Sequence, residues 1–402
     1  MAAIATEIAA QPAEPPVLKP AVPASERLMS VDALRGFDMF WIVGAEWLVS
    51  GLEKVTKAGL APGTEPSGLI NLIATQLQHK QWEGLAFEDL IFPLFVFIAG
   101  VSTVFSLSKS VEQGGANAAM WRLFKRAVLL YVVGIFYYGG FNKSFNDIRL
   151  LGVLQRIAIC YLFAGLTFCL FKLRGMIVVC VALLVGYWAL MSFVHVPGVE
   201  GHSFDEGKNY ANYIDSQYLP LRKWDGKSAA FPNGHHDPEG LLSTIPAIAS
   251  CLLGCFAGML LKNPNMDSRK KVLWLFIGGL ACVALGYAWS LQFPIIKKLW
   301  TSSYVLVVGG YSSMLLATFY LIIDVWKMQK WAMPFVWIGT NSITIYLSEQ
   351  FISYKGIAAR FVGGDVNKWF GVYGELMIAL VAIALTLVFM NFLYRKKIFL
   401  RL

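Results

Sequence analysis

The chain has 402 residues, of which 57% are hydrophobic, 14% are aromatic and only 15% are charged. Soluble domains carry about 25% charged residues, so this composition excludes an ordinary soluble domain and indicates a membrane protein. The net charge of +9 does not indicate nucleic-acid binding, because no stretch combines a basic run with elements that read DNA or RNA.

The N-terminal segment differs in composition from the rest of the chain. Residues 1–26 are rich in Ala, Pro and Glu, which predicts a disordered tail. The segment has no basic start followed by an apolar core, so it is not predicted to be a signal peptide. We expect residues 27–402 to form one transmembrane domain.

Apolar runs of about 20 residues recur down the chain, and each is long enough to cross a bilayer core of about 30 Å. The sequence therefore predicts an all-α polytopic membrane protein with about ten transmembrane helices in one bundle. The expected spans lie near residues 34–52, 89–108, 121–139, 152–171, 175–194, 241–261, 271–291, 302–323, 331–352 and 372–394.

The basic residues predict how these helices are oriented. Lys and Arg gather in the short loops after the second, fourth, sixth and eighth spans and in the C-terminal tail. Such loops are cytoplasmic by the positive-inside rule, so we expect both termini to be cytoplasmic. The longest opposite loop, 195–240, holds four of the five histidines and many aromatic residues, and we expect it to cap an outer cavity.

The stretch from His79 to Gly100, HKQWEGLAFEDLIFPLFVFIAG, joins a polar, aromatic loop directly to an expected membrane helix. Histidine titrates near neutral pH and can take a proton from an amine or a hydroxyl, which makes His79 a candidate general base. Asp89 stands where the chain enters the helix. It could cap the helix, orient His79 or bind a cationic amine, and the sequence leaves these roles open.

Charged residues inside membrane spans are costly and often mark functional sites. In the first span, Asp32 and Arg35 lie three residues apart, so we expect them to form an ion pair on one helix face. Glu46 is expected near the outer end of this span, at the depth of His79. A glutamate buried there could act as an acid or a base.

Polar residues also stand at the start of the fourth span and within the ninth. Arg156, next to Gln155, lies about one turn into the fourth span and could neutralise Glu46 or Asp89, or hold a phosphate or carboxylate. In the ninth span Asn341 and Ser342 could join helices by hydrogen bonds. Glu349 is expected at the same depth as Glu46.

The segment HHDPEG precedes the sixth span. Pro238 suits the first turn of a helix, and Glu239 suits its positive end. His235 and His236 have the side chains of metal ligands, but no third group is spaced for zinc, so no metal is expected.

Taken together, these stretches resemble a family of transmembrane acyltransferases typified by heparan-α-glucosaminide N-acetyltransferase, with bacterial homologues linked to N-acetylglucosamine use. The similarity covers nearly all of residues 27–395. The motifs that match are SVDALRG (30–36), the stretch 79–100, R-x-x-G-V-L-Q-R (149–156), DPEG (237–240), LWTSSYV (299–305) and GTNSI (339–343).

The resemblance implies transfer of an acetyl group from cytosolic acetyl-CoA, as co-substrate, to the amine of an amino sugar at the outer (periplasmic) side of a bacterial inner membrane. It places the catalytic histidine at His79, and Glu46 stands where the family has an asparagine. The catalytic candidates are His79, Glu46 and Asp89. The substrate-binding candidates are Trp82, Glu239, Asn341, Ser342 and Glu349. The candidates for binding CoA are Arg156, Arg35 and Gln155.

Two other functions fit the same features. A permease for amino sugars or N-acetylglucosamine would also combine many helices, intramembrane acids and an aromatic outer loop. An O-acyltransferase of envelope glycans would transfer the acyl group to a hydroxyl. The expected partners are the sugar and the lipid bilayer, with no nucleic acid. The sequence leaves open a homodimer, the exact acceptor, and direct transfer against an acetyl-histidine intermediate.

Overall fold

The computed structural model describes residues 28–58, 68–142, 148–199, 201, 203–219 and 237–400. The expected tail at 1–26 and the histidines His202, His235 and His236 lie outside these residues. The described chain is helical, and within it the only β pairing is an isolated bridge between Glu83 and Ile296.

Among the described residues, seven helical segments are long and apolar enough to cross a membrane. They are α3 (Phe87–Tyr137), α4 (Val153–Leu170), α5 (Leu173–Phe193), α7 (Thr244–Lys262), α8 (Ser268–Ser290), α9 (Ser302–Phe319) with its extension η2 (Tyr320–Val325), and α14 (Gly374–Arg395) with the short helix η4 (Gly371–Tyr373) that precedes it. Many apolar side chains on α5, α8 and α14 are exposed, which is typical of helices that contact lipid. The chain is an integral membrane protein.

α3 contains the second and third expected spans. Its backbone leaves the helical conformation at Gly115, where φ is 78° and a residue with a side chain would be strained. Nη1 of Arg126 donates to Oγ of Ser106 at 3.4 Å, although the two are 20 residues apart. A straight helix would separate them by about 30 Å, so the two halves of α3 fold back on each other.

The expected span at 331–352 is not one continuous helix. It is divided into η3 (Lys330–Ala332), α10 (Met333–Gly339) and α11 (Ser342–Ser348). α1 (Met29–Lys57) is long but carries charged residues along its length, and it is not among the seven segments. The expected count of ten spans is therefore not confirmed, and the orientation of the termini stays a prediction.

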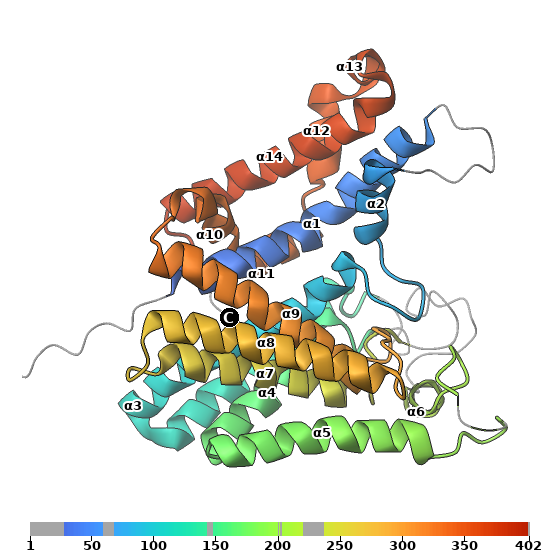
Figure 1. The fold of residues 1–402 in the computed structure, drawn as a ribbon. Coiled ribbons are helices and arrows are strands. Elements are labelled where there is room, and N and C mark those ends of the chain that lie inside the picture. Colours follow the sequence, from blue (N-terminus) through green and yellow to red (C-terminus); the bar gives the residue numbers. More distant parts are fainter. Residues whose placement is uncertain are drawn as a thin grey trace, which may run out of the picture.

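The long helices run side by side in Figure 1, with α5 at one edge of the bundle and α14 at the other. The shorter helices are α2 (Leu69–Gln76), α6 (Tyr210–Tyr218), α12 (Tyr354–Val362), α13 (Gly364–Trp369) and η4 (Gly371–Tyr373). α2, α6 and the loop between α8 and α9 lie towards the same end of the bundle, on the right of Figure 1.

α1 packs closely on α10 through two glycines. A Cβ atom at Gly36 would overlap the carbonyl of Phe335, and one at Gly339 would overlap the carbonyl of Asp32. Small residues allow membrane helices to approach to backbone contact, so this packing holds the break between α10 and α11 beside α1.

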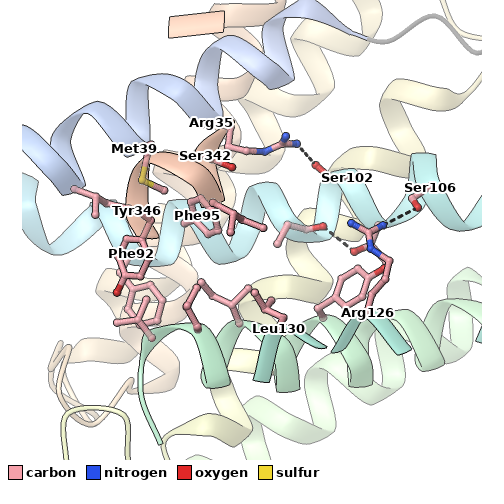
Figure 2. A pocket seen from close by; sticks show the side chains of 18 residues that line it. Arg35, Met39, Phe92, Phe95, Ser102, Ser106, Arg126, Leu130, Ser342 and Tyr346 are labelled. Atoms are coloured by element: carbon pink, nitrogen blue, oxygen red, sulfur yellow. Dashed lines mark hydrogen bonds between the residues drawn. The ribbon is translucent and has the colours of Figure 1, made fainter. Parts of the chain in front are cut away.

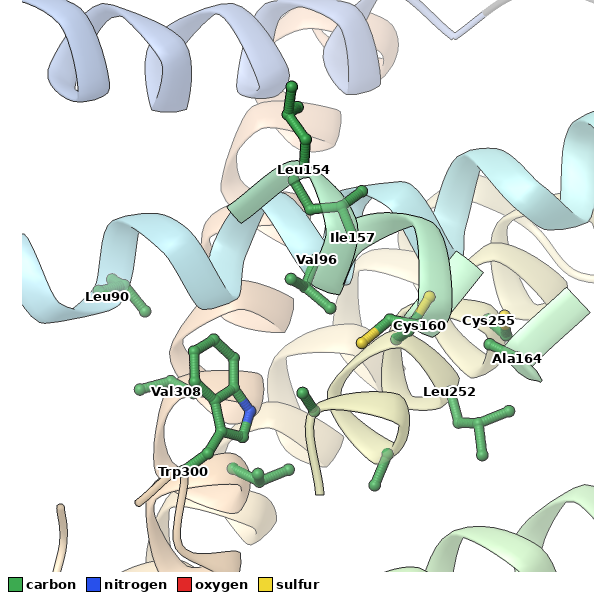
Figure 3. Packing of buried hydrophobic residues seen from close by; sticks show 14 of the residues in the cluster. Leu90, Val96, Leu154, Ile157, Cys160, Ala164, Leu252, Cys255, Trp300 and Val308 are labelled. Atoms are coloured by element: carbon green, nitrogen blue, oxygen red, sulfur yellow. The ribbon is translucent and has the colours of Figure 1, made fainter. Parts of the chain in front are cut away.

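The largest buried apolar cluster lies mainly between α3, α4, α7 and α9 (Figure 3). Trp300 is fully buried in it, and its ring meets that of Phe92 edge-on with centroids 5.2 Å apart. Trp300 anchors the loop between α8 and α9 on the bundle and so positions the polar residues that precede it in that loop.

Candidate active site

His79 lies in the loop before α3, and Asp89 lies in the first turn of that helix. Nδ1 of His79 is 3.1 Å from Oδ1 of Asp89. The other carboxylate oxygen accepts the N–H groups of Lys80 at 3.2 Å and Ala86 at 3.0 Å. Asp89 therefore both caps the helix and orients His79, two of the three roles that the sequence left open.

The two side chains of this pair differ in exposure. Asp89 is fully buried, whereas 59% of the His79 side chain is exposed. Among the described residues, Nε2 of His79 has no hydrogen-bond partner. If Asp89 accepts the Nδ1 proton, Nε2 is left with a lone pair that can take a proton from a substrate.

Lys297, in the loop between α8 and α9, also contacts this pair. Its Nζ lies 3.0 Å from Nδ1 of His79 and 3.4 Å from Oδ1 of Asp89. Burial lowers the pKa of Lys297, and the charge of Asp89 acts in the opposite direction. The sequence analysis missed Lys297 because 218 residues separate it from His79. Its position in an expected outer loop, next to the LWTSSYV motif, is the feature of the sequence that could have marked Lys297 as a site residue.

Backbone contacts hold the loop of Lys297 against the loop of His79. The N–H of Gly84 donates to the carbonyl of Ile295 at 2.9 Å, beside the bridge between Glu83 and Ile296. The hydroxyl of Tyr304 donates to the backbone carbonyl of Asp89 at 2.6 Å. Two segments far apart in the sequence thus form one structural unit.

Trp82 connects this unit to the described part of the outer loop. Its Nε1 donates to the carbonyl of Phe204 at 3.0 Å, and Lys298 lies over its ring at 5.6 Å. Further along the same loop, Asp215 on α6 accepts the N–H of Leu241 at 2.9 Å. The described part of the 195–240 loop therefore packs on the His79 end of the bundle.

Arg149, before α4, forms an ion pair with Glu239, before α7. The Glu239 side chain is more deeply buried than that of Arg149. Nη2 of Arg149 is 2.5 Å from Oε2 of Glu239 and 3.5 Å from Oδ1 of Asp237. The guanidinium also stacks over Tyr138 at 4.3 Å. Gln155 is fully buried and donates from Nε2 to the carbonyl of Arg149 at 3.0 Å. Two predicted site residues, Glu239 and Gln155, are thus brought together by Arg149.

Arg156 neutralises neither Glu46 nor Asp89, which corrects one expectation. Its guanidinium stacks over Trp300 at 4.9 Å and donates to the Ser243 hydroxyl, and only 1% of the residue is exposed. The reason is the rotation of α4, which turns Arg156 towards α7.

A cavity of about 450 Å³ lies between α1, the two halves of α3, α4 and α11 (Figure 2). Most of its wall is apolar. Arg35 and Arg126 stand towards one end, where Nη2 of Arg35 donates to Oγ of Ser102 at 2.6 Å and Arg126 donates to Ser106. Phe92 and Tyr346 line the part away from these arginines.

Only one of the three predicted CoA contacts lines this cavity, namely Arg35. On α4 the lining residues are Val153, Leu154 and Ile157, so Gln155 and Arg156 lie on other faces of the helix. The second arginine on the cavity wall is Arg126, which was not among the predicted site residues, and not Arg156.

The cavity approaches the His79 pair without including it. Phe92 on the cavity wall lies about one helical turn beyond Asp89 on α3. Its ring packs against Trp300, three residues after Lys297. The apolar part of the cavity therefore points towards the loops that hold His79.

Residues 69–225 match the family model described as heparan-alpha-glucosaminide N-acetyltransferase, catalytic. The chain is also 29% identical over 371 residues to heparan-alpha-glucosaminide N-acetyltransferase of Homo sapiens, across 80% of this chain and 55% of that protein. The resemblance to this acetyltransferase family is confirmed. The protein of the same name from Mus musculus is 28% identical over 372 residues, across 80% of this chain and 56% of its own length. The chain thus spans about half the length of these relatives.

The six motifs that resemble the acetyltransferase family meet in three contacting pairs. The contacts are Tyr304 to the Asp89 carbonyl (2.6 Å), Arg149 to Glu239 (2.5 Å) and Arg35 to the Gly339 carbonyl (3.3 Å). Motifs that are scattered in the sequence therefore meet in the folded chain, and four of them contribute residues to the cavity wall.

The remaining predicted residues lie on α1 and around the break in the expected ninth span. Asp32 and Arg35 form the expected ion pair, at 3.5 Å. Ser342 lines the cavity, and Asn341 is buried next to it with no partner for its amide among the described residues. 

The acids Glu46 and Glu349 lie within electrostatic range of each other. Glu46 is exposed, and within the described part of the chain no hydrogen bond or ion pair joins it to His79. The described residues also include no group of three or more His, Cys, Asp or Glu that could hold a metal.

Proposed function

We propose that this chain is a transmembrane N-acetyltransferase that moves an acetyl group from acetyl-CoA to the amine of glucosamine or a related amino sugar. The observation that carries the proposal is the His79–Asp89 pair beyond the apolar part of a cavity that has two arginines at its other end. The relatives are named as N-acetyltransferases of a heparan α-glucosaminide, which supports an amino-sugar acceptor.

The cavity suits a long donor with one anionic end. Guanidinium groups bind phosphates well, and Arg35 and Arg126 supply two of them. The apolar wall beyond them suits the uncharged arm that carries the thioester. Arg126 follows the basic residues Arg122 and Lys125, which we expect at the cytoplasmic surface, so the donor would enter from the cytosol.

The proposed chemistry begins with a proton transfer. An amine that is protonated at neutral pH cannot attack a thioester, so Nε2 of His79 takes one proton while Asp89 holds Nδ1–H. The amine nitrogen then bonds to the carbonyl carbon and gives a tetrahedral intermediate, whose nitrogen releases its second proton to solvent. The carbon–sulfur bond breaks, and the proton held by His79 passes to the departing CoA sulfur. We favour this direct transfer over an acetyl-histidine intermediate. 

The tetrahedral intermediate needs a hydrogen-bond donor for its oxygen. The buried amide of Asn341, next to Ser342 on the cavity wall, is our candidate. Glu46 and Glu349 are candidates for binding the cationic amine before it loses its proton. Trp82 and Glu239 are candidates for contacts with the sugar from the side of the outer loop.

We propose that the protein lies in a bacterial inner membrane with both termini cytoplasmic and His79 on the periplasmic side. The basic short loops support this orientation. A reporter fused after residue 225 is expected to read as periplasmic, and a cytoplasmic result would overturn the orientation. The oligomeric state plays no part in the proposal.

One experiment separates the proposal from its alternatives. Purified protein in nanodiscs receives labelled acetyl-CoA and glucosamine, and we expect acetylated sugar that is lost in His79→Ala. His195→Ala, which changes an exposed histidine at the end of α5, is the matched control and should keep the activity. Sugar uptake into liposomes without CoA release would favour a permease instead, and transfer only to hydroxyl groups would favour an O-acyltransferase.

A further inference from the structure

We propose that Lys297 is a positioning residue of this site, whose ammonium keeps the imidazole of His79 uncharged and therefore able to accept the proton of the amine. The inference rests on the proposed function, because it concerns the base of that reaction. It does not make Lys297 a group that touches the substrate.

Three atoms carry the inference, and they form a closed triangle. Nδ1 of His79 is 3.1 Å from Oδ1 of Asp89, Nζ of Lys297 is 3.0 Å from Nδ1, and Nζ is 3.4 Å from Oδ1. A carboxylate alone beside an imidazole favours its protonated form. Because Nδ1 gives its proton to Asp89, the ammonium does not donate to Nδ1; it donates to Oδ1 of Asp89 and acts on the imidazole through its charge. This charge opposes the protonated imidazole, because that form would put two positive charges 3.0 Å apart.

The balance of charge around His79 depends on this lysine. Among the described residues, Lys297 is the one cation that contacts the imidazole. The charged groups near the pair come from three segments: Glu88 and Asp89 on α3, Lys297 between α8 and α9, and Glu239 before α7. Lys80 and Glu83, in the loop of His79, contact these segments through their backbones. Without Lys297 the imidazole would face mainly carboxylates.

The loop holds the Lys297 side chain in place. A charge acts steadily on one atom only if its position is fixed. The Lys297 side chain is only 20% exposed. The residues on both sides of it are fixed: the Tyr187 hydroxyl donates to the carbonyl of Leu299 at 2.6 Å, and the N–H of Ile296 donates to the Thr301 hydroxyl. Lys297 therefore keeps its ammonium beside His79 without the freedom of a surface lysine.

The next residue provides a matched control. Lys298 has the same charge on the same loop, but its Nζ lies 3.5 Å from Glu206 and over the ring of Trp82. It points to the outer loop and not to the imidazole. Removing this second charge should change the charge of the loop equally without changing the charge balance at Nδ1.

The test is the dependence of kcat/KM for glucosamine on pH, between about pH 5 and 9, for purified protein in nanodiscs. In Lys297→Met the imidazole more easily becomes positive, so we expect the acid limb to move upward by about one pH unit. Activity should fall about tenfold on the acid side of the profile, by a smaller factor at neutral pH, and recover at higher pH. Lys297→Arg should restore the profile, and Lys298→Met should leave its acid limb unmoved.

A loss of activity that is equal at every pH, with the acid limb unmoved, would show that Lys297 only supports the loop and would overturn the inference. A second measurement does not need turnover. The imidazole signal of His79, assigned in NMR spectra by its absence in His79→Ala, should titrate at higher pH in Lys297→Met than in the wild type. If no acetyl transfer occurs in any variant while this NMR shift is observed, the proposed function fails and the charge relationship stands.

Discussion

Oδ1 of Asp89 lies 3.1 Å from Nδ1 of His79, with the carboxylate fully buried and the imidazole largely exposed. The buried partner is held by two backbone N–H groups, so it cannot turn away when the imidazole changes its charge. This arrangement fixes which nitrogen of His79 faces a substrate. It also leads to the first of four predictions.

Replacing Asp89 by Asn should remove most of the activity while keeping the fold. The amide has the shape of the carboxylate but can donate to Nδ1, which would leave the proton on Nε2 and remove the base. We expect kcat to fall by about 10²–10⁴-fold, as for other general bases, with an unchanged elution volume on size exclusion. Glu83→Gln, an exposed acid in the same loop, is the control, and activity of Asp89→Asn close to the wild type would contradict the assignment.

The ion pair of Arg149 and Glu239 predicts strong coupling between the two residues. Arg149→Met leaves the acid buried without its counter-charge, which costs about 3–5 kcal/mol. The double variant Arg149→Met/Glu239→Gln should recover much of this loss. Thermal unfolding in detergent measures both. If the double variant is as unstable as the sum of the single variants, the two side chains are not coupled in the way the geometry predicts.

Asp215 on α6 predicts a pH dependence of stability. Burial raises the pKa of its carboxyl to about 7, with the charge of Asp237 adding to the effect and the Leu241 N–H opposing it. An unfolded aspartate has a pKa of about 3.9, so the folded protein binds this proton more tightly. The resulting stability is fully present below about pH 4 and is lost as the pH rises to about 7.

The melting temperature between about pH 4 and 8 tests this dependence. Asp215→Asn carries no titrating proton and should remove this part of the decline. Asp205→Asn, on an exposed part of the same loop, should retain it. A wild-type curve that runs parallel to that of Asp215→Asn would exclude Asp215 as the source.

Arg126 is predicted to bind the donor and not the acceptor. Arg126→Gln removes one charge-assisted contact, so we expect the KM for acetyl-CoA to rise by about tenfold or more. The KM for glucosamine should stay the same. Arg122→Gln is the control because it lies one turn earlier on the same half of α3 and does not line the cavity. An equal change in both KM values would place Arg126 outside the donor site.

The sequence by itself determined the class of the protein and predicted the residues at the centre of the candidate site. Long apolar runs with few charges form helices in a membrane, because a helix pairs its own backbone N–H and C=O groups where lipid offers no hydrogen bonds. His79 and Asp89 could be paired in advance because they are ten residues apart, on either side of a helix start. Asp32 and Arg35 could be paired for a similar reason, since local helix geometry alone sets their distance.

Contacts between distant helices were decided only by the tertiary structure. Lys297 joins His79 across 218 residues, Arg126 joins the cavity through the fold-back of α3, and Arg156 faces α7 and not the acids. Such pairings depend on the rotation of each helix about its axis. In a soluble protein the apolar stripe defines that rotation, but in a membrane both the lipid face and the core face are apolar. Polar partners across the bundle therefore cannot be assigned until the helices are packed.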